Sequence, residues 1–368
     1  MSGRIVDIET YTVRVPLPKP FTLGRMQIKD REYCIVRVRD EQGTEGVSYG
    51  LTRNAPIGAT VRQTISPAWQ GADLDRHDEV YNQTVQANVC LGTHGIFWRA
   101  LSLCDCALYD LLAKRAEKPL GEYLNGIGRP IHLLLVGGYP TPDETHDSLG
   151  TQVQAMREAG ADGVKIASSG DPARDTARLK VCREVLGPDF PVMIDLFWQV
   201  QDPHRFAREI RCWKDLNLGW IEDPVAFDDY EGIELLRREA GVPIAVGDEQ
   251  SGLRAFSRLM EPGRVNVVRL DATVCGGVRA FLKIAELADR HGLPVACHIF
   301  DQLHTQLAYA APNVNWVERM PESLGLDSAH LLWRTAPKPS KPDFHHDFSG
   351  IGIEWDWNAV NTYRSKET

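Results

Sequence analysis

The sequence lacks paired cysteines and any excess of basic residues. None of its eight cysteines stands in a C-x-x-C pair of the kind that zinc sites and redox motifs use. We therefore expect reduced thiols in a cytosolic protein, most of them acting as small buried hydrophobes. Because 41 Lys and Arg face 50 Asp and Glu, the chain offers no basic stripe for a phosphate backbone. This argues against nucleic acid as a partner.

Long apolar runs are also missing. No stretch is long enough to cross a membrane, which excludes a membrane partner. The opening segment MSGRIVDIETYTVRVPL alternates like a strand and lacks the continuous apolar region of a signal peptide. These absences predict a cytoplasmic protein.

Length and patterning divide the 368 residues into three parts. A βα barrel takes roughly 250 residues, so the chain is about right for a barrel plus a smaller domain. Alternating strands followed by a helical stretch predict an α+β domain over 1–129. A barrel is predicted over 130–330. The segment 331–368 is rich in proline and glycine, so we expect it to be mostly irregular and to pack back on the first domain.

The barrel prediction depends on eight short apolar runs. Amphipathic stretches such as Thr151–Glu158, Ala173–Val185 and Val278–His291 separate them, and this alternation is typical of a parallel sheet with crossover helices. Eight such strands favour a closed barrel over an open sheet. The runs are IHLLLVG, DGVKIA, PVMID, LGWIED, PIAVGDE, VNVVRLD, LPVACH and NVNWVE.

Every run except the first carries an ionisable residue near its end. In a βα barrel the carboxyl ends of the strands converge on one face, where active sites are found. A single Asp there is commonly a helix N-cap. Seven ionisable groups on successive strands are a different matter, because the carboxylates among them would repel one another unless a cation neutralised them, which predicts a bound metal. The residues are Lys165, Asp195, Glu222, Asp248, Asp271, His298 and Glu318.

Asp195, Glu222 and Asp248 end neighbouring strands and offer hard oxygen ligands. Such ligands suit Mg²⁺ and argue against zinc. Glu249 adjoins Asp248 and is the alternative third ligand, because strand alternation turns only one of the two inward. We favour Asp248.

Asp271 and His298 end the sixth and seventh strands and are expected to be neighbours. An Asp that is hydrogen-bonded to one ring nitrogen fixes the tautomer of a histidine, which makes His298 a candidate general base. The alternative is a core histidine with satisfied hydrogen bonds. His304 is a weaker candidate, because it lies inside the following helix.

Taken in order, these segments resemble the enolase superfamily and, within it, the mandelate racemase subgroup. The resemblance covers nearly the whole chain. It is carried by GTEGVSYG, GVKIA, MID, WIEDP, VGDE, LDATVCGGV, ACHIF and WVER. It implies a modified (β/α)7β barrel whose mouth is capped by the first domain, and a homo-oligomer.

The resemblance also implies roles for the residues at the strand ends. Asp195, Glu222 and Asp248 would bind Mg²⁺, which holds a substrate carboxylate, and Asp271 and His298 match the subgroup's dyad. Glu318 matches an acid that hydrogen-bonds the carboxylate. Lys165 matches the first lysine of a K-x-K motif. Metal and lysine would stabilise the enediolate that forms when an α-proton is removed.

Two departures from the family pattern bear on the reaction. Ala167 replaces the second lysine of K-x-K, the base on the opposite face of the substrate, and Phe197 replaces a group that is often polar. A racemase needs two bases, whereas a dehydratase can use one histidine for both proton transfers. We therefore predict syn dehydration of a sugar acid, a small-molecule carboxylate, to a 2-keto-3-deoxy acid.

Two other functions fit the same residues. An epimerase or racemase of an α-hydroxy acid is the alternative, with Lys165 swinging to act as the second base. A non-catalytic binding member of the fold is a further alternative, since fold alone does not determine function.

Specificity residues are expected where the first domain closes over the barrel. The loop over 21–27 and the stretch over 49–54 are the candidates, and Phe21, Tyr49, Arg53 and Phe197 would contact substrate. The alternatives are that Tyr49 is a core strand residue and that Arg53 is a surface charge.

Overall fold

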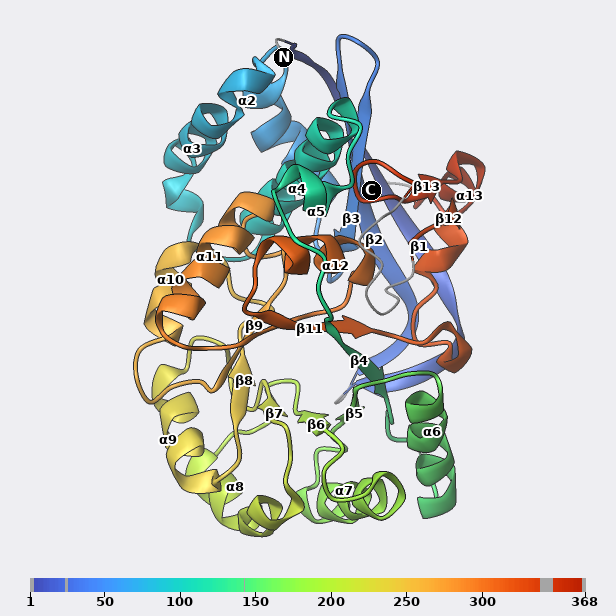
Figure 1. Ribbon diagram of the computed structural model, residues 1–368, viewed down its shortest axis with the longest axis vertical. Coiled ribbons are helices and arrows are strands. Elements are labelled where there is room, and N and C mark those ends of the chain that lie inside the picture. The colour runs from blue at the N-terminus through green and yellow to red at the C-terminus, as the bar shows by residue number, and fades with distance from the viewer. Residues whose placement is uncertain (1–2, 24–25, 142, 338–346, 366–368) are drawn as a thin grey trace.

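The computed structural model describes residues 3–23, 26–141, 143–337 and 347–365. An antiparallel sheet and its helices lie above a ring of strands surrounded by helices (Figure 1). Among the described residues, no helix has the length and apolarity to cross a membrane. Six of the eight cysteines are buried and all eight are free, which agrees with their expected role as small hydrophobes.

The antiparallel sheet is built from β1 (Ile5–Leu23), β2 (Met26–Asp40) and β3 (Glu45–Leu51), in that order. The prediction of a loop over 21–27 is wrong for the described residues of this range, because they lie in β1 and β2, where Phe21 pairs with Ile28. The prolines before Phe21 shift the register but do not end the pairing. Residues 24 and 25 lie outside the described residues.

One long helix, α4 (Ile96–Arg115), packs on this sheet. Its contact with β3 is close, because a Cβ added to Gly46 would lie 2.0 Å from the carbonyl oxygen of Ala107. Glycine is needed there for the backbones to approach. The helices of this region are α1 (Ile57–Thr60), α2 (Ser66–Trp69), α3 (His77–Ala87), α4 (Ile96–Arg115) and α5 (Leu120–Tyr123).

The closed barrel confirms the predicted fold class. Its strands are β4 (His132–Gly137), β5 (Gly163–Ala167), β6 (Val192–Asp195), β7 (Ile221–Glu222), β8 (Ile244–Val246), β9 (Val267–Leu270), β10 (Val295–Cys297) and β11 (Val314–Arg319). They are parallel, follow one another around the ring, and close where β11 pairs with β4. Each predicted run contributes one strand.

Seven helices connect these eight strands in the described part of the chain, which is the (β/α)7β pattern. They are α6 (His146–Glu158), α7 (Pro172–Leu186), α8 (Pro203–Glu209), α9 (Tyr230–Ala240), α10 (Leu253–Leu259), α11 (Val278–Arg290) and α12 (Asp301–Ala310). Amphipathic spacing predicted α6, α7 and α11 because such helices bury one apolar face against the strands.

The C-terminal segment is more regular than expected. It forms β12 (Trp333–Thr335), β13 (Glu354–Trp355) and α13 (Trp357–Thr362), elements too short to leave a sequence pattern. It reaches β1, where Ser365 N donates to Thr12 O at 2.8 Å (Figure 1). Pro339 and Pro342, two of the prolines from which we expected an irregular segment, lie outside the described residues. The boundaries at 129 and 330 and the oligomeric state stay predictions.

Candidate active site

The predicted dyad residues are in contact. His298 Nδ1 lies 2.8 Å from Asp271 Oδ2, and both side chains are buried. Asp271 Oδ1 accepts from Thr273 N at 2.7 Å and Thr273 Oγ1 at 2.8 Å, which favours the carboxylate form. Burial raises the pKa of Asp271 to about 7, against the effect of these donors. The carboxylate orients Nδ1–H toward itself and leaves the Nε2 lone pair for chemistry.

His298 has the properties of a neutral base. Burial lowers its pKa well below the ordinary value, and the positive charges of Arg53 and Arg269 add to the effect. Its Nε2 lies 3.8 Å from Asp248 Oδ2, so the free nitrogen faces the acidic cluster.

His304 connects the two loops that follow the dyad residues Asp271 and His298. Its Nε2 accepts from Ala272 N at 3.0 Å, and its Nδ1 donates to the carbonyl of Ile299. Ala272 follows Asp271 and Ile299 follows His298, so one ring ties together the two loops that carry the dyad. Burial lowers the pKa of His304 to about 4, which keeps the ring neutral. His304 is thus a structural neighbour of the base.

Lys165 gathers three carboxylates in the barrel centre. Its Nζ lies 3.3 Å from Asp195 Oδ2 and 2.9 Å from Glu318 Oε2, and it also pairs with Glu222. Burial alone would lower the pKa of Lys165, but Glu222 and Glu318 raise it. The lysine is therefore a fixed positive charge.

Arg269 is a second buried cation that our sequence analysis missed. It lies on β9, is fully buried, pairs with Glu318, and places Nε 3.1 Å from Glu222 Oε2. A signal existed, because Arg269 is two residues before Asp271 and strand alternation turns both the same way. Its position inside an apolar run concealed this.

The remaining carboxylates fit a hard cation. Asp248 Oδ1 and Asp223 Oδ1 are buried and have no hydrogen-bond partner among the described residues. Burial raises the pKa of Asp195 and of Asp223 well above the ordinary value, and the charge of Asp248 adds to both effects. A divalent cation would neutralise this repulsion, and carboxylate oxygens are ligands that Mg²⁺ prefers.

In this conformation, these side chains are not arranged as a metal-binding site. Among the described residues, no three His, Cys, Asp or Glu side chains stand close enough together to hold a metal ion. The ammonium group of Lys165 instead contacts both Asp195 and Glu222. A metal at these strand ends would have to displace that ammonium group from the two carboxylates.

Glu249, the alternative ligand, is engaged elsewhere. Arg53 donates to its Oε1 from Nε at 3.0 Å and Nη2 at 2.6 Å, and Arg99 contacts its Oε2. Both arginines belong to the region before the barrel. Glu249 therefore ties that region to the barrel mouth, whereas the neighbouring Asp248 keeps an unpartnered oxygen.

Unusual backbone conformations follow three of these strands. Left-handed φ angles occur at Phe197 (47°) and Trp198 (57°) after β6, at Asp223 (43°) after β7, and at Ile299 (23°) and Phe300 (50°) after β10. Residues other than glycine rarely adopt this region, and such strain gathers at functional sites.

An apolar cluster occupies the mouth beside Ala167. It contains Phe21 and Tyr139, with Phe197 packed against it. The ring centroids of Phe21 and Tyr139 are 4.3 Å apart, and those of Tyr139 and Phe197 are 6.3 Å apart. In the ring of eight strands, Phe197 follows β6, four places from the β10 that precedes His298. The part of the opposite wall formed by Ala167 and Phe197 is therefore apolar, whereas Lys165 on β5 and Asp195 on β6 are the charged residues of the same side of the ring.

Tyr139 is a further residue that the sequence analysis missed. It follows β4, the strand for which no ionisable end residue was found. Burial raises its pKa to about 12, and the charges of Arg31, Asp195 and Lys165 also act on it, which places the phenol near the buried charges. No pattern marked it in advance, because GGYP after an apolar run is ordinary turn sequence.

Tyr49 lies in a different environment. Its ring packs against Phe300 with centroids 5.0 Å apart, and its hydroxyl lies 3.2 Å from Gln302 Oε1. It borders a cavity of about 380 Å³ shared with Asp301 and Arg319. These contacts match a core strand residue, the alternative that the sequence left open, while contact with substrate stays a prediction.

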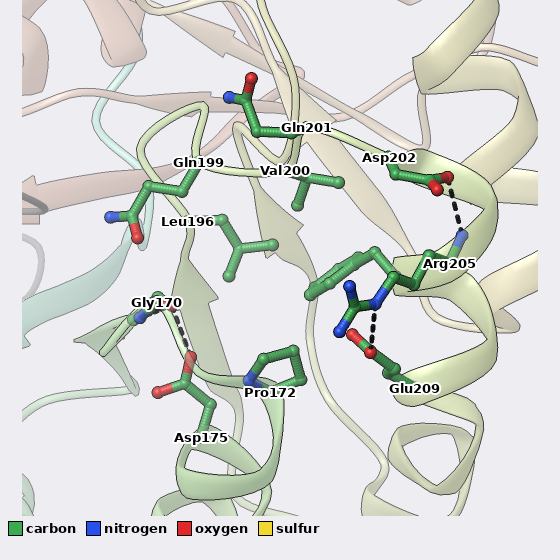
Figure 2. A pocket seen from close by; sticks show the side chains of 12 residues that line it. Gly170, Pro172, Asp175, Leu196, Gln199, Val200, Gln201, Asp202, Arg205 and Glu209 are labelled. Carbon is green, nitrogen blue, oxygen red and sulfur yellow. Dashed lines mark hydrogen bonds and ion pairs between the residues drawn. The ribbon is translucent and has the colours of Figure 1, made fainter.

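A second cavity, of about 290 Å³, lies between the amino ends of α7 and α8 (Figure 2). Gln199 and Leu196 come from the loop after β6, and Arg205 pairs with Glu209 at 2.7 Å on one side. The described residues that line it include none of the predicted site residues. We therefore place the candidate active site at the strand ends instead.

Comparisons with known proteins agree with this arrangement. Residues 7–125 match the family model "Mandelate racemase / muconate lactonizing enzyme, N-terminal domain", and residues 148–359 match "Enolase C-terminal domain-like". The L-talarate/galactarate dehydratase of Salmonella typhimurium is 32% identical over 86% of this chain and 81% of its own length. A less similar relative, an N-succinyl-L-Arg/Lys racemase of Bacillus cereus, is 21% identical over 84% of this chain and 82% of its own.

Solved structures share the whole fold. The L-talarate dehydratase from Polaromonas sp. JS666, complexed with Mg and L-glucarate, has a TM-score of 0.85 and 26% identity, and the match covers 100% of this chain and 98% of that one. Dehydratases are hydro-lyases, in agreement with the predicted enzyme class. With both family models matching in order, the chain belongs to the mandelate racemase/muconate lactonizing enzyme family of the enolase superfamily.

Proposed function

We propose that this protein is a Mg²⁺-dependent dehydratase that eliminates water from an α,β-dihydroxy sugar acid and forms a 2-keto-3-deoxy acid. The proposal depends on one observation above the others. His298 with Asp271 is the only dyad found at the described strand ends, and across the ring Ala167 and Phe197 belong to an apolar cluster that offers no second base at those two positions.

His298 performs both proton transfers in this proposal. Its Nε2 takes the α-proton, and the imidazolium that forms is stabilised by Asp271. The same Nε2–H then protonates the β-hydroxyl on the same face, which leaves as water while the Cβ–O bond breaks. The enol product tautomerises to the 2-keto acid, so one base suffices.

The remaining polar residues manage charge. Asp195, Glu222 and Asp248 would hold the Mg²⁺, which supplies positive charge for the substrate carboxylate and the enediolate. Lys165 would stabilise the same charge as a cation that Glu318 still holds once the metal has taken Asp195 and Glu222. Arg269 fixes Glu222 and Glu318 and so keeps these carboxylates in position.

A substrate panel tests the proposal. The purified protein with Mg²⁺ is incubated with aldonic and aldaric acids, and 2-keto acid is assayed. At least one acid should give keto acid with the wild type and none with a His298→Asn variant. Absence of keto acid from every member of the panel would overturn the proposal.

A racemase or epimerase is the second candidate, favoured by the presence of Lys165 near the centre. Lys165 abstracts a proton only if it becomes neutral, and its three carboxylate partners oppose this. Incubation in D₂O separates the two reactions. Inversion with deuterium at the α-carbon and no keto acid would support the racemase. A non-catalytic role is supported only if neither product nor exchange is found.

A further inference from the structure

Two arginines share one carboxylate at the barrel mouth. Arg53 follows β3 and donates twice to Glu249 Oε1, while Arg99 of α4 contacts Glu249 Oε2. Arg99 also donates from Nη1 to Leu51 O at 3.3 Å, which anchors it to the end of β3. Since Glu249 adjoins Asp248, this cluster lies beside the proposed metal ligands.

The cluster carries an excess positive charge. Two guanidinium groups face a single carboxylate, and they repel each other. Burial lowers the pKa of Arg99 to about 10, and the charge of Arg53 contributes to this, while the nearby Asp271 and Asp248 oppose it in part. A second anion beside Arg53 would relieve the repulsion.

Arg53 is the arginine that is free to meet a ligand. Its side chain is 35% exposed, against 9% for Arg99. Within the described residues, both bonds to Glu249 use Nε and Nη2, and Nη1 has no partner. The backbone is left-handed at Arg53 (φ 54°) and Asn54 (φ 58°), a conformation that asparagine adopts readily and arginine rarely.

Arg53 is also close to the chemistry. Its charge contributes, after burial, to the lowered pKa of His298. Glu249, which pairs with Arg53, adjoins Asp248, whose Oδ2 lies 3.8 Å from His298 Nε2, so a substrate bound at His298 can extend toward the cluster formed by Arg53, Arg99 and Glu249.

We propose that Arg53 binds the distal carboxylate of a dicarboxylic sugar acid, so that aldaric acids are the preferred substrate class. The inference rests on the proposed function and adds a subsite to it. A guanidinium group matches a carboxylate with paired, charge-assisted hydrogen bonds. When Arg53 binds the substrate carboxylate, Glu249 still pairs with Arg99. The buried Arg99 therefore keeps a counter-charge.

Matched substrate pairs provide the test. Glucarate and gluconate, or galactarate and galactonate, differ only in the distal carboxylate. With the wild type and Mg²⁺, we expect kcat/KM to favour the diacid at least tenfold. Arg53→Gln should abolish the preference mainly through KM, and Arg53→Lys should keep part of it. Arg205→Gln, which removes an exposed arginine on α8, is the control and should keep it in full.

The outcomes separate this inference from the proposed function. A wild type that dehydrates the aldonic acid as well as the diacid, or an R53Q variant that keeps the preference, overturns the role of Arg53 while dehydration stands. Absence of keto acid from both pairs contradicts dehydration instead. Calorimetric binding of glucarate and gluconate to the His298→Asn protein, with and without R53Q, then still measures the diacid preference. Circular dichroism confirms that each variant is folded.

Discussion

Arg269 donates from Nη1 to the carbonyl oxygen of Cys297 at 2.8 Å, immediately before His298. The same guanidinium group pairs with Glu222 and Glu318, so it joins the backbone of β10 to two buried carboxylates. Replacing one partner of a buried charge network leaves the others unpaired, which typically costs ~3–5 kcal/mol.

Arg269→Met should therefore lower the free energy of unfolding by roughly 3–5 kcal/mol, because Glu222 and Glu318 lose a buried counter-charge. Urea denaturation measures this. Arg290→Met, which removes a surface pair with Glu286, is the matched control and should change stability little. Equal stabilities of the two variants would contradict the role given to Arg269.

His298→Asn should reduce kcat by about a hundredfold to ten-thousandfold, since the variant has no proton acceptor. An amide keeps a donor toward Asp271, so the fold is preserved. Loss of α-deuterium exchange, followed by NMR, measures the effect directly. Exchange at the wild-type rate would remove His298 from the mechanism.

Removal of the metal should abolish activity, and Mg²⁺ should restore it, because the substrate carboxylate and the enediolate would lose the positive charge that the metal supplies. Asp248→Asn should weaken Mg²⁺ binding in calorimetry. Glu249→Gln should bind Mg²⁺ as the wild type does, because Glu249 faces Arg53 and Arg99. The reverse result would make Glu249 the ligand.

The free energy of unfolding should decrease as the pH is lowered from 6.5 to about 4, because of His304. Its pKa is lowered from 6.5 to about 4 in the folded protein by burial, so in this window the unfolded chain binds a proton that the folded chain does not. The contribution of His304 is complete above pH 6.5 and is lost as pH falls, by ~1.4 kcal/mol per pH unit.

His304→Gln tests this dependence, because glutamine offers an acceptor toward Ala272 without titrating. The slope of unfolding free energy against pH should be smaller in the variant. Identical slopes would show that His304 is already protonated in the folded state, contrary to the hydrogen bond that it accepts.

The sequence reveals the barrel and its strand-end residues for a topological reason. Once eight strands close in order, the residues after them must meet, and Asp195, Asp271 and His298 need no further information. Arg53 and Glu249 are different. They are 196 residues apart, and their pairing depends on how the sheet docks on the barrel, which no local pattern encodes. Likewise Trp333 and Trp355 pair across strands too short to recognise.

Closure of the barrel between β4 and β11 has a consequence for synthesis. β4 cannot pair with β11 until β11 has been synthesised. A chain emerging from the ribosome therefore keeps an open sheet edge until nearly all of it has been made. Contacts between such distant segments form slowly. The mouth with its charged residues is therefore among the last regions to assemble, and a chain that stops before β11 has no complete active site.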